Sequence, residues 1–305
     1  MKEIRPLLSI CIPTYNRANC IGTCLDSIVS QFEDEHIKNN TEIVISDNGS
    51  TDNTTEIVKK YQEKYNNIFY FRNEKNLGFD RNVVNVIEKS KGVYCLTIGD
   101  DDAFFENSIG NILTKLENSN TPFYSLNFWG YDGELKNPIL TKPNMAPADD
   151  IHYQKLSDYI KSINEYTNMV GMFVGLSIQL FLRDPWIEFK NKEKFFDTQI
   201  IHMYINLITF KDKPFTIISK PTIKTRSSNI RWESFTGLEK VNNRIKETIK
   251  TTKWIMDNFN IKIPNYKIYT YFYVREYWFT LKEIIKAFLY KIGLGIIINI
   301  YRKIR

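Results

Sequence analysis

The sequence lacks several features that would place it in common protein classes. Its four cysteines form no Cys-x-x-Cys pair and nothing at the N-terminus resembles a secretion signal, so we expect reduced thiols and a cytoplasmic protein. Cys20 and Cys24 have the spacing of two helical metal ligands, but no neighbouring His or Cys completes a site, so packing is expected. The longest uncharged run of the C-terminal segment, residues 292–301, is too short to span a bilayer. Disulfide-rich and membrane-spanning classes are therefore excluded.

The first 120 residues alternate between two kinds of segment. Short runs rich in β-branched residues predict strands at 8–12, 42–46, 68–71 and 93–98, and amphipathic segments predict helices at 18–31, 52–64, 80–90 and after residue 107. This alternation predicts βαβ units, hence an α/β fold with a mostly parallel sheet flanked by helices. Ligands of such sheets bind at the carboxyl ends of the strands.

A polar cluster follows each of the four expected strands. The clusters are Pro13–Arg17, Asp47–Asp52, Asn76–Asn82 and Gly99–Asp102. Each alone has an ordinary structural explanation, because Ser50, Asp52 or Asp80 can cap a helix and Asn-Gly is a common turn. Their coincidence on one edge of the expected sheet predicts a ligand site there.

Three adjacent carboxylates, Asp100, Asp101 and Asp102, give the sharpest signal. Neighbouring carboxylates repel each other by roughly 1 kcal/mol per pair in water and by more as water is excluded. A divalent cation offsets this repulsion, and hard oxygen ligands suit Mg²⁺ or Mn²⁺, which can share their other positions with a diphosphate. Reactions that expel a nucleoside diphosphate gain from such a cation. The alternative is an exposed acidic turn that caps the helix after residue 107.

The residues Leu8–Arg17, Ile43–Asp52, Gly78–Asn82 and Asp100–Asp102, in this order and spacing, resemble family 2 glycosyltransferases of the GT-A fold. The Gly-Asp-Asp-Asp form and the preceding Gly-Phe-Asp-Arg-Asn run are most similar to the abequosyltransferase-like branch of O-antigen sugar transferases. The resemblance implies a Rossmann-like GT-A catalytic domain that binds a nucleotide-sugar.

The resemblance also implies roles for individual residues. Thr14 and Tyr15 would border the nucleobase and ribose, Asp47 would accept a base N–H, and Arg81 would lie beside Asp47. The implied nucleotide-binding positions are Pro13, Thr14, Tyr15, Arg17, Asp47, Arg81 and Asp100. The triplet stands at the Asp-x-Asp metal motif, with Gly99 in place of the usual first aspartate. Either Asp100 and Asp102 form the metal pair, or Asp101 takes the metal with support from Asp102.

An inverting member of this family needs a carboxylate base about 90–100 residues beyond the metal motif, at the start of a helix. Asp197 lies at that distance and is expected to open a helix over 197–209. It would remove the proton of the acceptor hydroxyl as the sugar carbon is attacked. The alternatives are that Asp197 is an ordinary N-cap, or that Asp184 is the base.

Further along the chain, a polar loop over 225–229 would close over the diphosphate or the acceptor, with Arg226 as a phosphate partner or as a solvated arginine. Residues 129–150 have no periodicity and predict a long mobile loop suited to cover the acceptor side. We therefore expect a catalytic domain over 1–235, with a nucleotide-sugar half (1–120) and an acceptor half (121–235), and a helical extension over 236–305.

The helical extension carries most of the positive charge. Residues 261–305 have nine Lys or Arg and two Glu, which is a net charge of +7. The whole chain has a net charge of +6, so the rest of the chain is close to neutral. Because the basic residues alternate with large aromatic and aliphatic ones, an anionic membrane surface is favoured over nucleic acid. The alternative is a helical bundle packed on the catalytic domain or on a second subunit.

These observations favour an inverting glycosyltransferase on the cytoplasmic face of a membrane. It would add a sugar to a surface glycan carried on a polyprenyl lipid, and UDP is favoured over GDP, CDP and dTDP in the donor because Asp47 and Arg81 suit a pyrimidine. A nucleotidyltransferase is less favoured, since Pro13–Arg17 contains no glycine. A non-catalytic nucleotide-sugar-binding protein is the other alternative.

The tail predicts a measurable membrane interaction. Attraction to anionic lipid adds about 1 kcal/mol per basic residue near the surface to the burial of apolar groups. Deleting residues 284–305 is therefore expected to release the protein from anionic liposomes in a sedimentation assay, while high salt weakens binding only partly because the apolar contribution survives screening. A full-length protein that never sediments with anionic vesicles contradicts the membrane interpretation.

Overall fold

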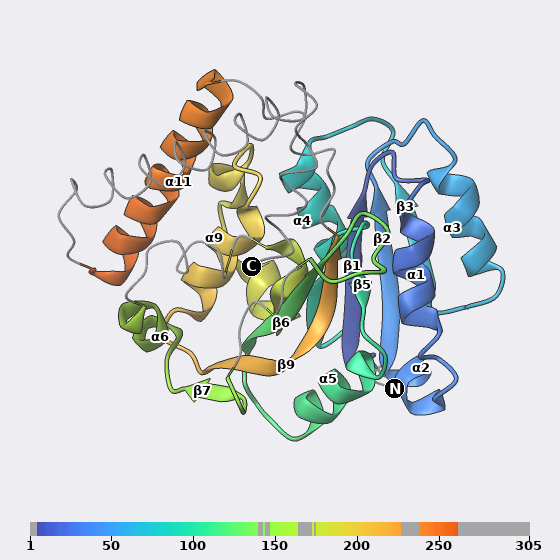
Figure 1. Ribbon diagram of the computed structural model, residues 1–305, viewed down its shortest axis with the longest axis horizontal. Helices are drawn as coiled ribbons and strands as arrows, with labels where there is room; N and C mark the ends of the chain where they lie inside the picture. Colours follow the sequence, from blue (N-terminus) through green and yellow to red (C-terminus); the bar gives the residue numbers. More distant parts are fainter. Residues whose placement is uncertain are drawn as a thin grey trace, which may run out of the picture. The chain divides into compact units, whose positions relative to one another are not determined.

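The computed structural model describes residues 5–139, 143, 147–163, 173, 175–226 and 238–261 (Figure 1). Contacts divide the chain into two units, one made of residues 1–163 with 171–228 and the other of residues 164–170 with 229–305. The boundary expected after residue 235 stays a prediction, because residues 227–237 lie outside the described part of the chain.

The first unit is built on one nine-stranded sheet with helices on both faces (Figure 1). The strands are β1 (Leu8–Thr14), β2 (Thr41–Asp47), β3 (Ile68–Arg72), β4 (Tyr94–Thr97), β5 (Ala103–Phe104), β6 (Phe123–Tyr131), β7 (Ile151–Tyr153), β8 (Gln179–Leu182) and β9 (Phe215–Arg226). The helices are α1 (Ile21–Val29), α2 (Glu35–Asn40), α3 (Thr54–Gln62), α4 (Phe79–Lys89), α5 (Ser108–Glu117), α6 (Leu156–Ser162), α8 (Arg183–Glu188) and α9 (Ile201–Phe210), with 3-10 turns η1 (Leu176–Ile178) and η2 (Lys192–Phe195).

The sheet is parallel in one half and mixed in the other. Strands β3, β2, β1 and β4 are parallel neighbours, as the βαβ pattern predicts. Beyond them β8 lies antiparallel between β4 and β6. Strand β9 runs parallel to β6, and β5 and β7 pair with it in the antiparallel direction. The sequence pattern could not show this second half, because β4 pairs there with a strand that is far away in the chain.

All four strands and all four helices expected in the first 120 residues are present. Parallel pairing sets Thr14 opposite Asp47 and Cys11 opposite Thr97, so β1, β2 and β4 end at the same edge. The clusters that follow these strands therefore meet, as the sequence predicted.

Alternation along β1 separates two packed layers. Leu8, Ile10 and Ile12 belong to a fully buried cluster with Ile21 and Leu25 of α1 and with residues of α3 and α5. Residues between them point to the opposite face, where α4 packs on β1 and β2. In Figure 1, α1 and α3 accordingly lie together at one side of the parallel strands.

The structure changes two expectations for the middle of the chain. Only the start of 129–150 departs from the expected loop, because β6 continues through Tyr131 and pairs along this stretch with β9, whereas the described residues 132–139 and 147–150 form turns, bends and irregular backbone. The end of β6 is closed by a turn in which the Asp132 carboxylate accepts the backbone N–H groups of Glu134 and Lys136. Arg226, expected in a loop, is the last residue of β9. Residues 140–142, 144–146 and 227–229 lie outside the described residues.

The second unit contains the helix α11 (Leu238–Phe259) in its described part, which agrees with the helical pattern expected after residue 236. Within the described residues, no helix is both long enough and apolar enough to cross a bilayer. The basic segment expected to bind a membrane, residues 262–305, lies outside them.

Candidate functional site

Two loops at the carboxyl edge of the sheet are fastened to each other by hydrogen bonds. After β1, the N–H of Asn16 donates to the Ser50 hydroxyl at 2.9 Å, and the N–H of Ala18 donates to the Asp52 carboxylate at 2.9 Å. Asp52 also accepts the N–H of Thr54 at the start of α3. Ser50 and Asp52 thus connect the loops after β1 and β2, and Asp52 also binds a backbone N–H at the start of α3. Tyr15 is 41% exposed between these loops, whereas Pro13 and Thr14 are buried at the end of β1.

Asp47 is fully buried at the end of β2, and its carboxylate is already bound by the protein. It accepts the N–H of Ser50 at 2.8 Å and the hydroxyl of Tyr70. The guanidinium in contact with it belongs to Arg72, at 4.0 Å, and not to Arg81 as expected. In this structure Asp47 therefore acts as a buried group that holds the loop after β2.

The acidic triplet follows β4 at the same edge. The Arg17 guanidinium lies 3.2 Å from the Asp100 carboxylate. Burial raises the pKa of Asp100 to about 6, although the charge of Arg17 opposes the rise. A Cβ on Gly99 would stand 2.9 Å from an Asp101 carboxylate oxygen, so the glycine leaves room for Asp101 to fold back toward the strand. Asp100 is therefore a buried carboxylate with one cationic neighbour.

Asp102 is held from two other elements. Its oxygens accept the hydroxyl of Ser177, from η1, and the backbone N–H of Arg226 at 2.9 Å. The Arg226 side chain donates to the carbonyl of Asp101 at 2.7 Å and to that of Gly133. Burial, with repulsion from Asp101, raises the pKa of Asp102 to about 7. The structure thus brings Arg226 to the triplet.

The donor set of the triplet fits a Mg²⁺ or Mn²⁺ ion. Among the described residues, no three His, Cys, Asp or Glu side chains are arranged to enclose a metal by themselves. Mg²⁺ usually keeps several waters and takes one or two carboxylates together with substrate phosphates. The raised pKa values of Asp100 and Asp102 show buried negative charge that the protein compensates only in part, and a divalent cation would complete the compensation. Burial and the charge of Asp100 raise the pKa of the nearby Cys20 thiol to about 11.

Asp197 lies in a turn before α9 and does not begin that helix, so the expectation that it opens a helix or caps one is wrong. The helix begins at Ile201 with Ile200 at its N-cap. Asp197 has a left-handed backbone (φ 66°) and a side chain that is 80% exposed. Its carboxylate lies 3.2 Å from the Arg81 guanidinium, which also stacks over the Phe196 ring. An exposed carboxylate oriented by an arginine is accessible to an acceptor hydroxyl.

The turn that carries Asp197 is held by the carboxylate of Asp80. Asp80 is 3% exposed in the first turn of α4 and accepts the N–H of Gln199 at 2.9 Å and the N–H of Ile201 at 3.2 Å. It therefore caps α9 from a different helix, in place of the cap on α4 expected from sequence. Gln199, like Asp197, has a left-handed backbone that costs free energy unless its surroundings stabilise it. Asp80 supplies that stabilisation.

Asp184, the alternative base, lies at the opposite edge of the sheet. It pairs with Arg5, before β1, at 2.8 Å and with Arg183 at 3.1 Å. Its helix α8 follows β8, whose last residue Leu182 pairs with the first residue of β4. Since Asp100 follows the other end of β4, Asp184 cannot share a site with it.

Four supporting residues were not assigned by sequence reasoning: Tyr70 and Arg72 at Asp47, Asp80 at the Asp197 turn and Ser177 at Asp102. Asp80 belongs to a polar cluster that the sequence did single out. Ser177 has no local signal, because its partner is 75 residues away.

Removing the charge of Asp80 tests this arrangement. Hydrogen bonds to a charged group contribute about 1.5–3 kcal/mol each, so Asp80→Asn is expected to speed hydrogen exchange of the Gln199 and Ile201 amides at least about tenfold, as measured by NMR. Asp52→Asn is the matched control, since Asp52 also holds two backbone amides but away from this turn. Unchanged exchange at Gln199 and Ile201 in Asp80→Asn would show that Asp80 does not hold the turn.

Comparisons with known proteins match this chain to glycosyltransferases. Residues 9–181 match the family described as Glycosyl transferase family 2. The chain is 32% identical over 235 residues to the abequosyltransferase RfbV of Salmonella typhimurium, which covers 74% of this chain and 68% of that protein. It is 38% identical over 176 residues to the uncharacterized glycosyltransferase MG025 of Mycoplasma genitalium, over 52% of this chain and 57% of that protein.

Solved structures agree on the fold. Residues 1–349 of TarS from S. aureus, in complex with UDP-GlcNAc, superpose with a TM-score of 0.60 at 15% identity, over 86% of this chain and 69% of that chain. The sheet and the helices that flank it are thus those of a GT-A fold. The chain belongs to glycosyl transferase family 2.

Proposed function

We propose that this glycosyltransferase is metal-dependent and inverting, and that it transfers a sugar from a nucleotide-diphosphate sugar to a glycan acceptor carried on a polyprenyl lipid. The observation that carries the proposal is the triplet Asp100–Asp102, buried at Asp100 and half-buried at the other two, with the guanidinium of Arg17 on the Asp100 carboxylate and that of Arg226 on the Asp101 carbonyl. A cation held by these carboxylates, together with the two arginines, suits the binding of the diphosphate of such a donor.

The leaving group gains negative charge as its bond to the sugar breaks. Asp100, Asp101 and Asp102 would hold a Mg²⁺ or Mn²⁺ ion, whose positive charge would stabilise this leaving diphosphate. Arg17 and Arg226 lie beside the triplet in the described structure and would contact the same phosphates. The loops after β1 and β2 would hold the nucleoside, with the exposed Tyr15 against its base or ribose.

The acceptor would be activated by Asp197. A carboxylate in this position takes the proton of the acceptor hydroxyl as that oxygen attacks the sugar carbon from the side opposite the diphosphate, which inverts the configuration. Arg81 orients the carboxylate, and Asp80 holds the turn that carries it. This arrangement supports donor binding on one side of α4 and proton removal by Asp197 on the other side.

Relatives support the classes of donor and acceptor. The related abequosyltransferase favours a role in surface polysaccharide synthesis. The fold accommodates UDP-GlcNAc in TarS, which supports a UDP-sugar as the donor. We further propose that residues 261–305 keep the enzyme at the cytoplasmic face of a membrane, where a lipid-linked acceptor is exposed, or otherwise pack on a second subunit.

The metal assignment is tested by Asp101→Asn and Asp102→Asn. Each is expected to lower turnover at least about 100-fold, the size of a lost electrostatic contact to a developing charge. The measurement is release of nucleoside diphosphate from UDP-, GDP-, CDP- and dTDP-sugars with Mn²⁺, with EDTA expected to stop and Mn²⁺ to restore it. Asp34→Asn, at the start of α2, is the control expected to keep activity. Full turnover in EDTA would exclude metal dependence, and the absence of turnover with every donor would favour a non-catalytic nucleotide-sugar-binding protein.

The base assignment is tested by Asp197→Asn. Loss of a general base is expected to slow transfer about 10²–10⁴-fold, whereas stabilisation of the fold by nucleoside diphosphate in a thermal-shift assay should stay nearly unchanged. Asp184→Asn, at the opposite edge of the sheet, is the control for transfer. If Asp197→Asn keeps more than about a tenth of the wild-type rate, Asp197 is part of the turn and not the base.

A further inference from the structure

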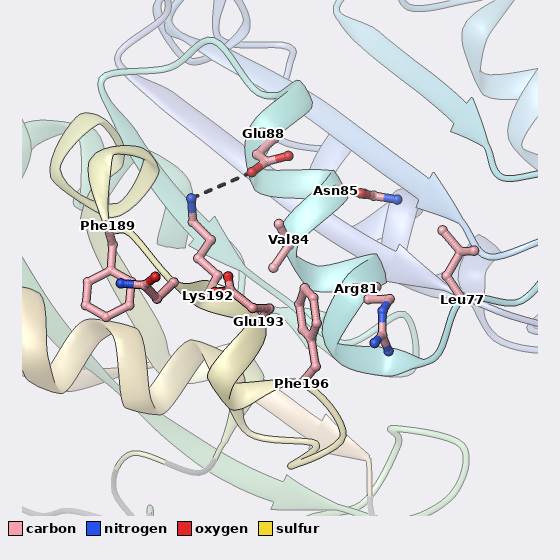
Figure 2. A pocket seen from close by; sticks show the side chains of 10 residues that line it. Leu77, Arg81, Val84, Asn85, Glu88, Phe189, Lys192, Glu193 and Phe196 are labelled. Atoms are coloured by element: carbon pink, nitrogen blue, oxygen red, sulfur yellow. Dashed lines mark ion pairs between the residues drawn. The ribbon is translucent and has the colours of Figure 1, made fainter.

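A pocket runs along α4 from the turn that carries Asp197 (Figure 2). Its volume is about 470 Å³, within the range of small-molecule sites. It is lined by Leu77, Arg81, Val84, Asn85, Glu88, Phe189, Asn191, Lys192, Glu193 and Phe196. Along the helix, Arg81 and Glu88 are about 10 Å apart at 1.5 Å per residue. The pocket therefore begins beside the candidate base and continues away from it.

The walls of the pocket combine apolar surface with hydrogen-bonding groups. In Figure 2 the Phe196 ring lies next to α4, and the Glu193 side chain lies between it and the more distant Phe189 ring. The Asn85 amide donates to Asn73 at 3.2 Å, which leaves its carbonyl oxygen as an acceptor. Aromatic faces beside carboxylate and amide oxygens suit a ligand with an apolar face and a rim of hydroxyl donors. A sugar ring has both.

The cations of the pocket are already compensated. Arg81 pairs with Asp197 at 3.2 Å. Lys192 lies 3.6 Å from the Glu88 carboxylate and donates to the carbonyl of Ile187 at 2.8 Å (Figure 2). The positive charges of Arg81 and Lys192 are thus balanced within the protein, and a phosphate or a carboxylate would also meet the charge of Glu193. The pocket therefore favours a neutral ligand.

Two residues of the pocket also support the candidate base. The Arg81 guanidinium is 4.3 Å from the centre of the Phe196 ring and pairs with Asp197, which follows Phe196 in the chain. A ring that packs on Phe196 would thus lie directly beside the turn where an acceptor hydroxyl meets Asp197. We propose that the pocket binds a neutral sugar unit of the acceptor glycan, adjacent to the unit whose hydroxyl is attacked. This proposal rests on the proposed function, because that function places the acceptor at Asp197.

The test is a titration of the full chain followed by backbone amide NMR, with methyl glycosides of glucose, galactose, mannose and rhamnose as neutral probes and glucose 1-phosphate as the charged probe. At least one neutral glycoside is expected to shift the amides of residues 77–88 and 189–196 in a saturable way, with a Kd in the millimolar range. Phe189→Ala and Glu193→Gln are expected to weaken that binding severalfold to tenfold, the usual size for one aromatic or polar contact.

Matched controls are available elsewhere on the surface. Phe69 is 38% exposed on β3 and Glu63 is exposed after α3, so Phe69→Ala and Glu63→Gln should leave glycoside binding unchanged. The proposal is overturned if no neutral glycoside shifts these amides at up to about 100 mM, if glucose 1-phosphate binds more tightly than all of them, or if the controls weaken binding as much as the pocket variants.

The titration needs no donor and no turnover, so its outcome is separate from that of the proposed function. Glycoside binding with an active Asp197→Asn enzyme would support the pocket and remove the base assignment. If Asp197→Asn is inactive and the wild-type protein binds no glycoside in this pocket, the base assignment stands and the pocket proposal is overturned.

Discussion

The side-chain amide of Asn82 joins the ends of two parallel strands. It donates to the carbonyl of Thr14, the last residue of β1, and to that of Ser46, one residue before the end of β2, and its oxygen accepts the Ser46 hydroxyl. The Thr14 carbonyl also accepts the backbone N–H of Asn48 at 2.9 Å, so the bond from Asn82 adds to the strand pairing at this edge. Because Asn82 is buried and bound to both strands, the first turn of α4 is fixed against the sheet edge. The loops after β1 and β2 and the turn that carries Asp197 are all placed relative to that helix turn.

The first turn of α4 serves both sides of the candidate reaction. Asn82 faces the strands, Asp80 holds the backbone of the turn before α9, and Arg81 pairs with Asp197. Three consecutive residues point in different directions around a helix, since each is rotated by a fraction of a turn. A rigid helix start thereby keeps the donor loops and the candidate base at a constant separation, which in-line displacement requires.

Electrostatics sets the second constraint at this edge. Asp100 is buried and Asp102 half-buried beside Asp101, and their pKa values are raised because desolvation and mutual repulsion disfavour the ionised forms. Arg17 and Arg226 compensate part of this charge from the start of the β1–α1 segment and from the end of β9. Such stored repulsion is typical of a site that a cation and a phosphorylated ligand complete. It also explains why residues of β9, more than 120 positions later, are held at the triplet.

The sequence by itself determined the parallel half of the sheet, the edge at which polar residues gather, the acidic triplet and the family. These follow from local periodicity and from short motifs, which depend on near neighbours in the chain. Only the tertiary structure decided which distant groups meet. It gave Asp47 the guanidinium of Arg72 in place of Arg81, set Ser177 and Arg226 on Asp102, and made Asp80 the cap of α9. Such pairings arise from strand order and helix packing, and no local pattern encodes them.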